Sequence, residues 1–260
     1  MNQLKINNLS KSFGGIQAIK NFNMTVDEHE KIGIIGPNGA GKTTLFNCLT
    51  GLYPLTEGEI LYTTENKSIT LNNYSVDKIT NLGLSRTFQN IRLFDSLSVL
   101  DNVKVAFNRL LEYGMIDSVL RTKKFYLEER MALEKALEYL EITDLREKAN
   151  DLASSLSYGE QRRLEIARAL ATGAKFLFLD EPAAGMNPQE THDLTEFINY
   201  IHKKFSLTIV LIEHDMNLVM KVCDRIYVLN YGEGIADGTP SEIQNNQKVI
   251  DAYLGGDDNA

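Results

Sequence analysis

A glycine-rich loop at residues 36–44 constrains the fold of this chain more than any other feature. The apolar run from Ile32 to Ile35 precedes the loop and predicts a buried strand, and the residues after it predict a helix opening at about Lys42. The loop fits the pattern of glycine, four variable residues, glycine, lysine and then serine or threonine, which is typical of phosphate-binding loops. The sequence therefore predicts a nucleotide phosphate site.

Each residue type in this loop has a chemical reason. Gly39 and Gly41 let the backbone turn tightly and direct N–H groups at phosphate oxygens, and the helix start adds the positive end of its dipole. Lys42 is expected to reach the β- and γ-phosphates, and the Thr43 hydroxyl to hold Mg²⁺. The candidate nucleotide-binding residues are Gly36, Asn38, Gly39, Ala40, Gly41, Lys42, Thr43 and Thr44. The alternative is an ordinary glycine-rich turn, which the flanking strand and helix disfavour. The loop does not identify the nucleotide.

The composition narrows the class of protein. A length of 260 residues suffices for one sizeable α/β domain or two small ones, and 43% hydrophobic and 24% charged residues are ordinary for a soluble protein. The formal net charge of −8 argues against a nucleic-acid partner. No apolar run approaches the roughly 18 residues of a membrane helix, and the first residues lack a signal-peptide core. We therefore expect a soluble protein of the cytosol.

The order of predicted elements favours an α/β fold. Residues 2–27 and 58–70 predict short strands, the latter with a polar turn at 64–66. From residue 175 onward, buried strands alternate with helices, as in a parallel sheet covered by helices. Strands are expected at 176–179, 207–212 and 226–229, helices at 188–205 and 215–222, a hairpin turn at 231–238, a last helix at 240–247 and a polar tail at 255–260.

Residues 98–150 have a different character. Apolar residues recur there at near-helical spacing among charged ones, namely Leu127, Met131, Leu133, Leu137 and Leu140. This pattern predicts an amphipathic helix with a solvated charged face. It indicates a helical subdomain inserted between the halves of an α/β core.

Two acidic residues follow the predicted strand at 176–179. Asp180, at the end of a buried strand beside a phosphate loop, is a natural second anchor for Mg²⁺. Glu181, one residue further, is placed to orient an attacking water. Taken alone, the pair is better explained as a strand end before the turn at Pro182.

Ser157 and Gly159 stand at the start of a predicted helix that runs to Ala171. The N–H groups and dipole of such a helix start can bind an anion. An ordinary serine N-cap explains the residues equally well.

The loop at 36–43, the segment at 156–161 and the Asp180-Glu181 pair, in this order along the chain and with a helical insert, resemble the ATP-binding cassette family of transporter ATPases over nearly the whole chain. The resemblance implies one domain over 1–260, with an α/β phosphate-loop NTPase core of mostly parallel sheet, a small antiparallel β portion and a helical subdomain at about 98–165. The common family form of the helix-start motif is Leu-Ser-Gly-Gly-Gln. This chain has Tyr158 and Glu160 at two of its positions but retains Ser157 and Gly159. Ser157, Gly159 and Glu160 are therefore further candidates for nucleotide contact.

The resemblance also assigns roles to isolated residues. Phe13 matches an aromatic that stacks on adenine, although a core phenylalanine is an alternative. Gln89 matches a glutamine that contacts Mg²⁺ and water, and His214 matches a histidine that contacts the γ-phosphate. The resemblance thus implies ATP and Mg²⁺ as cofactors. The candidate catalytic residues are Glu181, His214 and Gln89, and the candidate metal ligands are Thr43, Gln89 and Asp180.

The resemblance implies partners as well. Each ATP is expected between the loop of one chain and the Ser157 helix start of another, in a homodimer or a heterodimer with a related ATPase subunit. Transport then needs two separate integral membrane permease subunits at the cytoplasmic face of the plasma membrane, and indirectly a substrate-binding protein. The expected docking surface is the helical block with Gln89 and the patch from Arg92 to Phe94.

Several stretches resemble in particular the ATPase subunits of high-affinity branched-chain amino-acid importers. They are 86–94, 165–170, 181–188, 212–216 and 252–255. The alternatives are the ATPase of a lipid or lipopolysaccharide exporter and, with less support, a soluble cassette ATPase acting on ribosomes or DNA. A small-molecule kinase or GTPase is disfavoured because the chain lacks an Asn-Lys-x-Asp guanine signature and a kinase does not explain 156–161.

Overall fold

The computed structural model describes residues 2–64 and 67–254. The chain divides into two compact units, residues 1–89 with 175–260, here called the core unit, and residues 90–174, here called the helical unit. The helical unit extends beyond the expected limits of 98–165. One reason is that the Asn102 side chain hydrogen bonds to both the N–H and the C=O of Phe94. The predicted turn at 64–66 and the tail at 255–260 fall partly or wholly outside the described residues.

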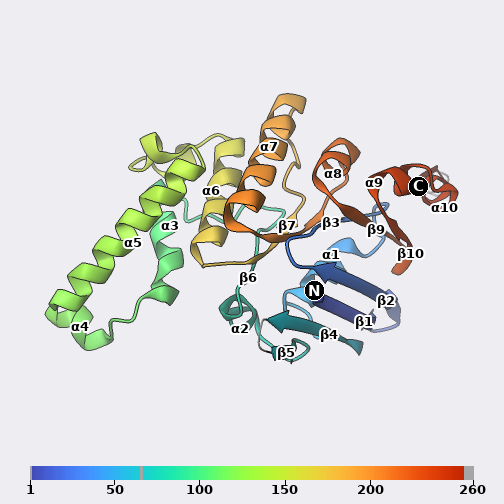
Figure 1. Ribbon diagram of the computed structural model, residues 1–260, viewed down its shortest axis with the longest axis horizontal. Coiled ribbons are helices and arrows are strands. Elements are labelled where there is room, and N and C mark those ends of the chain that lie inside the picture. The colour runs from blue at the N-terminus through green and yellow to red at the C-terminus, as the bar shows by residue number, and fades with distance from the viewer. Residues whose placement is uncertain (1, 65–66, 255–260) are drawn as a thin grey trace. The chain divides into compact units, whose positions relative to one another are not determined.

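A six-stranded sheet forms the centre of the core unit, with the strand order β10-β9-β3-β8-β7-β6 (Figure 1). Five of these strands are parallel, and β10 runs antiparallel to β9. The strands are β3 (Lys31–Ile35), β6 (Leu84–Arg86), β7 (Phe176–Asp180), β8 (Thr208–Ile212), β9 (Arg225–Asn230) and β10 (Glu233–Gly238). Apolar residues dominate β3, β7 and β8 because both faces of these strands are buried. The prediction of a mostly parallel sheet is confirmed.

A second, antiparallel sheet has the order β2-β1-β4-β5. Its strands are β1 (Asn2–Phe13), β2 (Ile16–Asp27), β4 (Glu57–Thr64) and β5 (Lys67–Thr70). Helix α1 (Lys42–Leu49), which follows the glycine-rich loop, contributes Leu45, Phe46 and Leu49 to the core that both sheets share. The ring of Phe46 packs edge-to-face on Phe178 of β7, with centroids 5.5 Å apart. This packing fixes the loop relative to the ends of the parallel strands.

The remaining helices of the core unit are α2 (Val76–Asn81), α7 (Pro188–Phe205), α8 (Met216–Val222), α9 (Pro240–Gln244) and α10 (Gln247–Leu254). Helix α7 has the predicted bounds. Asn187 caps it, because its side chain accepts the N–H groups of Gln189 and Glu190. Helix α8 begins one residue later than predicted, because Asp215 serves as its N-cap.

Two expectations near the C-terminus were wrong. Residues 231–238 are not all turn, since Tyr231 and Gly232 make the turn and the rest form β10. The strand was missed because Gly234 and Gly238 lie within it, where glycine is uncommon. The last helix does not run over 240–247 but ends at Gln244, and a further helix, α10, follows.

The helical unit contains α3 (Val99–Phe107), α4 (Met115–Leu120), α5 (Lys123–Ile142), α6 (Tyr158–Ala171) and short 3₁₀ helices at 108–110, 146–148 and 153–155. The buried face of α5 consists of Ala132, Ala136 and Leu140, at intervals of four residues. Small alanines let neighbouring helices approach closely. The predicted apolar face was therefore wrong at Leu127, Met131 and Leu133, which are exposed, and right at Leu140.

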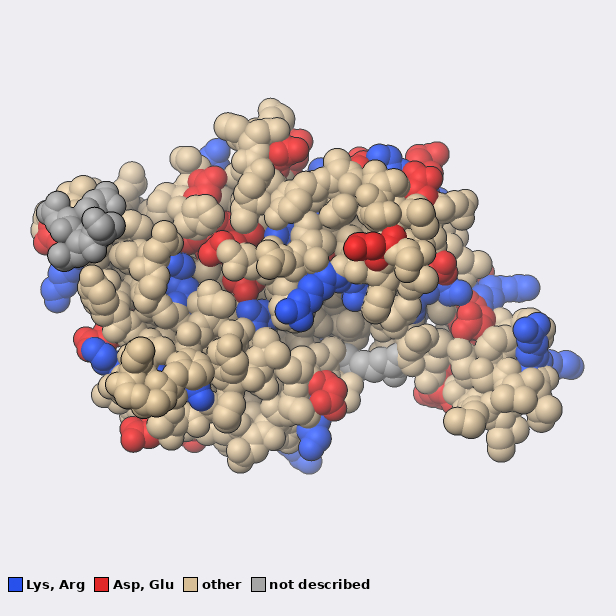
Figure 2. All heavy atoms as spheres, turned by 180° about the vertical axis from the view of Figure 1, so that it is seen from behind, with Lys and Arg blue, Asp and Glu red and all other residues tan. Residues whose placement is uncertain are grey.

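No helix within residues 2–64 and 67–254 is both long and apolar enough to span a bilayer. On the face of the molecule that Figure 2 shows, the coloured acidic and basic side chains are mixed. The excess of acidic residues, 35 against 27 basic ones, does not gather there in one large patch.

Candidate nucleotide-binding site

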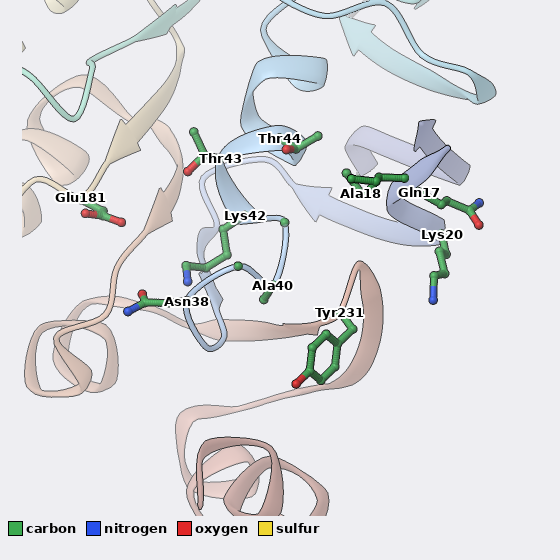
Figure 3. Close-up of a pocket in the computed structure, with 13 residues that line it drawn as sticks. Gln17, Ala18, Lys20, Asn38, Ala40, Lys42, Thr43, Thr44, Glu181 and Tyr231 are labelled. Atoms are coloured by element: carbon green, nitrogen blue, oxygen red, sulfur yellow. The ribbon is translucent and has the colours of Figure 1, made fainter. Parts of the chain in front are cut away.

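A pocket of about 530 Å³ lies over the glycine-rich loop (Figure 3). Residues 38–44 of the loop line it together with Glu181 and Tyr231. Four residues from the start of β2 complete the lining, namely Ile16, Gln17, Ala18 and Lys20. The volume suits a small organic ligand. The structure thus gathers seven of the eight predicted loop residues around one cavity.

The loop can adopt this path only with glycine at two positions. Gly36 has a φ of 153°, and a Cβ there would lie 2.0 Å from the Leu229 carbonyl oxygen. Gly41 has a φ of 103°, and a Cβ there would lie 2.7 Å from the Ala18 carbonyl oxygen. Both residues therefore combine a left-handed backbone with close contact to a neighbouring strand or turn. These contacts explain why the two glycines of the motif stand where they do.

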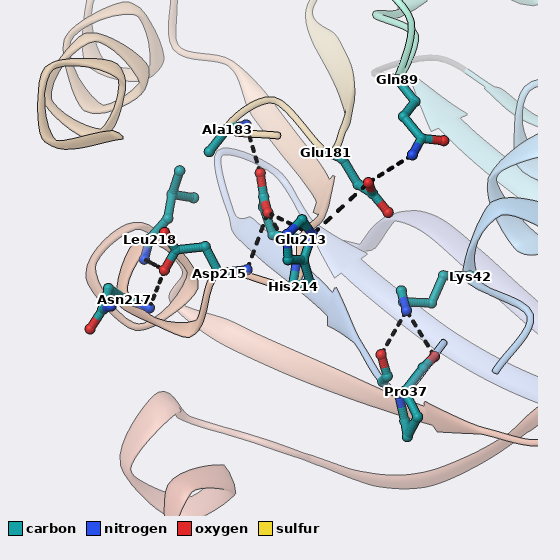
Figure 4. A network of polar contacts seen from close by, with 11 residues as sticks. Pro37, Lys42, Gln89, Glu181, Ala183, Glu213, His214, Asp215, Asn217 and Leu218 are labelled. Carbon is teal, nitrogen blue, oxygen red and sulfur yellow. Dashed lines mark hydrogen bonds and ion pairs between the residues drawn. The ribbon is translucent and has the colours of Figure 1, made fainter. Parts of the chain in front are cut away.

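The Lys42 side chain lies within the loop itself. Its Nζ donates hydrogen bonds to the carbonyl oxygens of Gly36 (2.6 Å) and Pro37 (3.0 Å) (Figure 4). Burial lowers the pKa of Lys42, and the carboxylate of Glu181 opposes that shift. A phosphate group entering the pocket offers this ammonium stronger acceptors than two carbonyls.

The three candidate catalytic residues meet where the parallel strands end. Glu181 directly follows β7, and His214 stands two residues after the end of β8. The Nε2 atom of Gln89 donates a hydrogen bond of 2.9 Å to Oε2 of Glu181, and Nδ1 of His214 lies 3.9 Å from the same oxygen (Figure 4). Carboxyl ends of parallel strands meet at one edge of a sheet, where α/β proteins place their sites. The sequence order alone could not show that Gln89 reaches Glu181.

Asp180 is buried next to this group. One of its carboxylate oxygens, Oδ2, accepts a hydrogen bond of 2.5 Å from Arg86. The other, Oδ1, is buried and has no hydrogen-bond partner among the residues that the structure describes. A buried carboxylate oxygen without a partner is costly, so it is suited to a ligand.

Sequence reasoning missed Glu213, which is fully buried between two turns. Its carboxylate accepts the N–H groups of Ala183 (2.7 Å), His214 (3.0 Å) and Asp215 (3.3 Å). Burial raises the pKa of Glu213 although these hydrogen bonds oppose the shift. The residue ties the turn after β7 to the turn after β8 and so positions Glu181 and His214. Its place directly after a buried strand was the available signal.

Two aromatic residues, Phe13 and Tyr231, differ in their position relative to the pocket. Phe13 does not line the pocket: it is 44% exposed, its ring packs edge-to-face on Tyr53 at 5.3 Å, and Nζ of Lys11 lies 4.8 Å from its centroid. Its contact with adenine stays a prediction. Tyr231, which does line the pocket, is 73% exposed. No signal in the sequence marked it, because the hairpin turn that presents it depends on the pairing of β9 with β10.

Ser157, Gly159 and Glu160 belong to the helical unit. Ser157 is the N-cap residue of α6, and its N–H and Oγ both donate to Oε2 of Glu160 at 3.0 Å. Lys148 donates to Oε1 of Glu160 at 2.7 Å. A Cβ added at Gly159 would meet nothing within 4 Å. The structure gives Glu160 a role in starting the helix, and contact of these residues with a nucleotide stays a prediction.

A glycine-rich loop between β3 and α1, a buried lysine and carboxylates at the strand ends define a phosphate-loop nucleotide-binding protein. A family model described as ABC transporter matches residues 19–184, and one described as branched-chain amino acid ATP-binding cassette transporter matches 235–259. The chain belongs to the ABC transporter family of ATP-binding proteins and is an ATPase of that family.

Individual relatives agree with this assignment. The high-affinity branched-chain amino acid transport ATP-binding protein LivG of Escherichia coli K12 is 47% identical over 252 residues, which cover 97% of each chain. The ADP conformation of MJ1267, an ATP-binding cassette of an ABC transporter, has a TM-score of 0.83 and 32% identity, covering 98% of this chain and 99% of its own. A dimeric post-hydrolysis state of the cassette MJ0796, bound to ADP and Pi, has a TM-score of 0.74 and 27% identity, covering 91% and 98%.

Proposed function

We propose that this protein is the ATP-hydrolysing subunit of an importer for branched-chain amino acids. One observation carries the ATPase assignment: Glu181 lines the same pocket as the phosphate loop and is oriented by Gln89. The transported class is supported by the family model over the last residues and by the 47% identity to a protein of that name.

The residues of the core unit have separate roles in ATP hydrolysis. The loop N–H groups and Lys42 bind the phosphates, and the helix dipole of α1 favours their negative charge. Glu181 holds the attacking water in line and so contributes mainly by positioning the water. His214 stands beside Glu181, where it can contact the terminal phosphate. Together these groups favour phosphoryl transfer to water.

The residues also fit Mg²⁺. Its expected ligands are the Thr43 hydroxyl, the buried Oδ1 of Asp180 that lacks a partner among the described residues, and the Gln89 amide. Hydroxyl, carboxylate and amide oxygens are the ligands this ion prefers. When bound, the ion supplies positive charge against the β- and γ-phosphate oxygens.

In the proposed mechanism the protein acts as a dimer. Ser157 and Gly159 of one chain contact the terminal phosphate of the ATP held by the other chain. The open space over Gly159 supports this arrangement, because an approaching phosphate meets no side chain of the same helix. The dimeric state of a similar cassette with ADP and Pi supports it as well. ATP then holds the pair together, and hydrolysis releases it.

Transport requires two permease subunits in the membrane, so the protein acts at the cytoplasmic face of the plasma membrane. They dock on the helical unit. All four apolar residues of α4 are exposed there, as are several at the start of α5, namely Met115, Ile116, Val119, Leu120, Tyr126 and Leu127. Such a set of exposed apolar side chains is typical of a surface that binds a partner. The extracellular substrate-binding protein acts only through the permeases.

Uptake of radiolabelled leucine by cells that lack the gene tests the proposal. We expect the wild-type gene to restore uptake and Lys42→Ala to fail, while an uncharged amino acid outside the branched class is unaffected by either. Normal leucine uptake in the deletion strain, with no redundant importer active, contradicts the substrate. Uptake restored by Lys42→Ala contradicts the role of ATP.

A further inference from the structure

Arg86, the last residue of β6, connects the candidate metal ligand Asp180 to helix α1. Its Nη2 donates to Oδ2 of Asp180 at 2.5 Å. Its Nη1 donates to Oδ1 of Asn47 at 2.7 Å and to Oγ1 of Thr50 at 3.0 Å. Both charged side chains are buried, with 7% of Arg86 and 2% of Asp180 exposed. One guanidinium therefore spans the end of β7 and the helix that follows the phosphate loop.

The orientation of this guanidinium is fixed on several sides. Its Cζ lies 5.6 Å from the ring centroid of Phe46 and 5.2 Å from that of Phe88. The Thr50 hydroxyl donates to the carbonyl oxygen of Phe46 at 2.7 Å, which leaves its lone pairs for Arg86. A planar fork with directed N–H groups suits these contacts, and the single ammonium of a lysine does not.

Arg86 binds only one of the two carboxylate oxygens of Asp180. An arginine that serves only to neutralise a buried carboxylate commonly binds both oxygens. Here Oδ1 remains buried and without a hydrogen-bond partner among the described residues. A buried ion pair by itself is weak evidence for a stabilising role. The arrangement is instead suited to holding the carboxylate in one orientation with one oxygen available for a cation.

We propose that Arg86 is a positioning residue for the Mg²⁺ site. It fixes Asp180 relative to α1, which begins with Lys42 and Thr43, so that the carboxylate and hydroxyl ligands keep their spacing when the nucleotide arrives. This inference rests on the proposed function, in which Asp180 and Thr43 hold the metal of Mg²⁺–ATP. Residues that orient a metal ligand commonly affect metal affinity by about 10-fold or more.

The test measures ATP binding rather than turnover. In the full chain carrying Glu181→Gln, the dissociation constant of fluorescently labelled ATP is determined with excess Mg²⁺ and again with excess EDTA. The ratio of the two constants is the gain in affinity that Mg²⁺ provides. We expect Arg86→Lys to reduce this gain about 10-fold while binding in EDTA changes less than about twofold, because the loop and Lys42 are unaltered. Arg225→Lys is the matched control, since Arg225 pairs with Glu30 at the opposite end of the parallel strands.

Asn47→Ala is the second variant, because it keeps the charge pair and a good helix former and so protects folding. It should reduce the gain from Mg²⁺ about threefold, in the same direction. If Mg²⁺ increases ATP affinity in both variants as much as in the parent chain, the role of Arg86 is overturned. An equal loss of ATP affinity with Mg²⁺ and with EDTA also overturns it, because that result indicates a purely structural residue. If the Glu181→Gln chain itself binds no ATP in either condition, it is the proposed function that fails.

Discussion

The amide of Gln89 donates a hydrogen bond of 2.9 Å to Oε2 of Glu181. Gln89 lies three residues after β6 and Glu181 directly after β7, and these two strands are neighbours in the parallel sheet. The contact therefore couples the loop after β6 to the Glu181 carboxylate, which we propose orients the attacking water. Any partner that displaces Gln89 therefore changes the orientation of Glu181.

Replacement of Glu181 by glutamine should abolish hydrolysis and retain ATP binding. We expect ATP turnover to fall at least about 100-fold, because an amide neither accepts a proton nor holds the water as the carboxylate does. The ATP-bound pair should then persist and appear as a dimer by light scattering after gel filtration with ATP. Glu196→Gln, an exposed change on α7, is the control and should behave as wild type. A monomer in saturating ATP contradicts the pairing.

Replacement of Gly159 by alanine should lower ATP turnover without destabilising the folded chain. In the free chain the added methyl group meets nothing within 4 Å, and alanine stabilises a helix by about 1 kcal/mol relative to glycine. We expect the melting temperature to rise slightly while ATP turnover falls at least about tenfold, since the methyl group obstructs the phosphate of the partner chain.

Gly114→Ala is the matched control, because Gly114 also belongs to the helical unit, has a negative φ and has open space around it. It should leave turnover unchanged. Full activity of Gly159→Ala contradicts a nucleotide contact at this helix start.

The aromatic that contacts the adenine can be identified by comparing two ligands. Tyr231 lines the pocket, and Phe13 is the residue that the family resemblance favours. We expect Tyr231→Ala to weaken ATP binding about fivefold, as loss of an aromatic contact does. Binding of inorganic tripolyphosphate, which has no base, should be unaffected. The same pair of measurements on Phe13→Ala tests its stacking role, and a variant that weakens both ligands equally does not touch the base.

Glu160 should make the start of α6 sensitive to acid. Its hydrogen bond from Lys148 is the main cause that lowers the pKa of Glu160 below its ordinary value of 4.5. A lowered carboxyl pKa means that the stabilisation is complete above the unfolded pKa, near 4.5, and is lost as the pH falls through the folded pKa. Glu160→Gln should therefore lower the free energy of unfolding by about 1 kcal/mol at pH 7, and the difference from wild type should vanish in strong acid.

Urea unfolding of both chains across that pH range measures the difference. Glu147→Gln, an exposed change nearby, is the control and should show none. A difference between Glu160→Gln and wild type that is independent of pH contradicts the assigned cause.

Local sequence patterns predicted the phosphate loop and the buried strands because each depends on its own residues. The loop residues Gly36 and Gly41 need a left-handed backbone, and β7 is buried on both faces, so both leave a strong signal in sequence. The bounds of α7 followed for the same reason, since Asn187 and Pro188 mark its start.

The features that sequence reasoning missed depend on which segments meet in space. The buried face of α5 is set by alanines at 132 and 136, which carry little hydrophobic signal and face inward only because other helices pack there. Glu213 can join the two turns only because the N–H group of Ala183, thirty positions earlier, donates a hydrogen bond to it. Tyr231 enters the pocket because β10 pairs back on β9. Each of these relationships depends on contacts between segments that are distant in the sequence, which local sequence patterns do not show.

The exposed apolar side chains of α4 have a practical consequence for work on the isolated subunit. In water, with no partner bound, these side chains form an exposed apolar surface that does not depend on nucleotide. We therefore expect concentrated preparations to self-associate through this face. This association should depend neither on ATP binding nor on ATP hydrolysis. Replacing Ile116 and Val119 by serine should reduce this self-association, so that dimerisation driven by nucleotide can be measured separately.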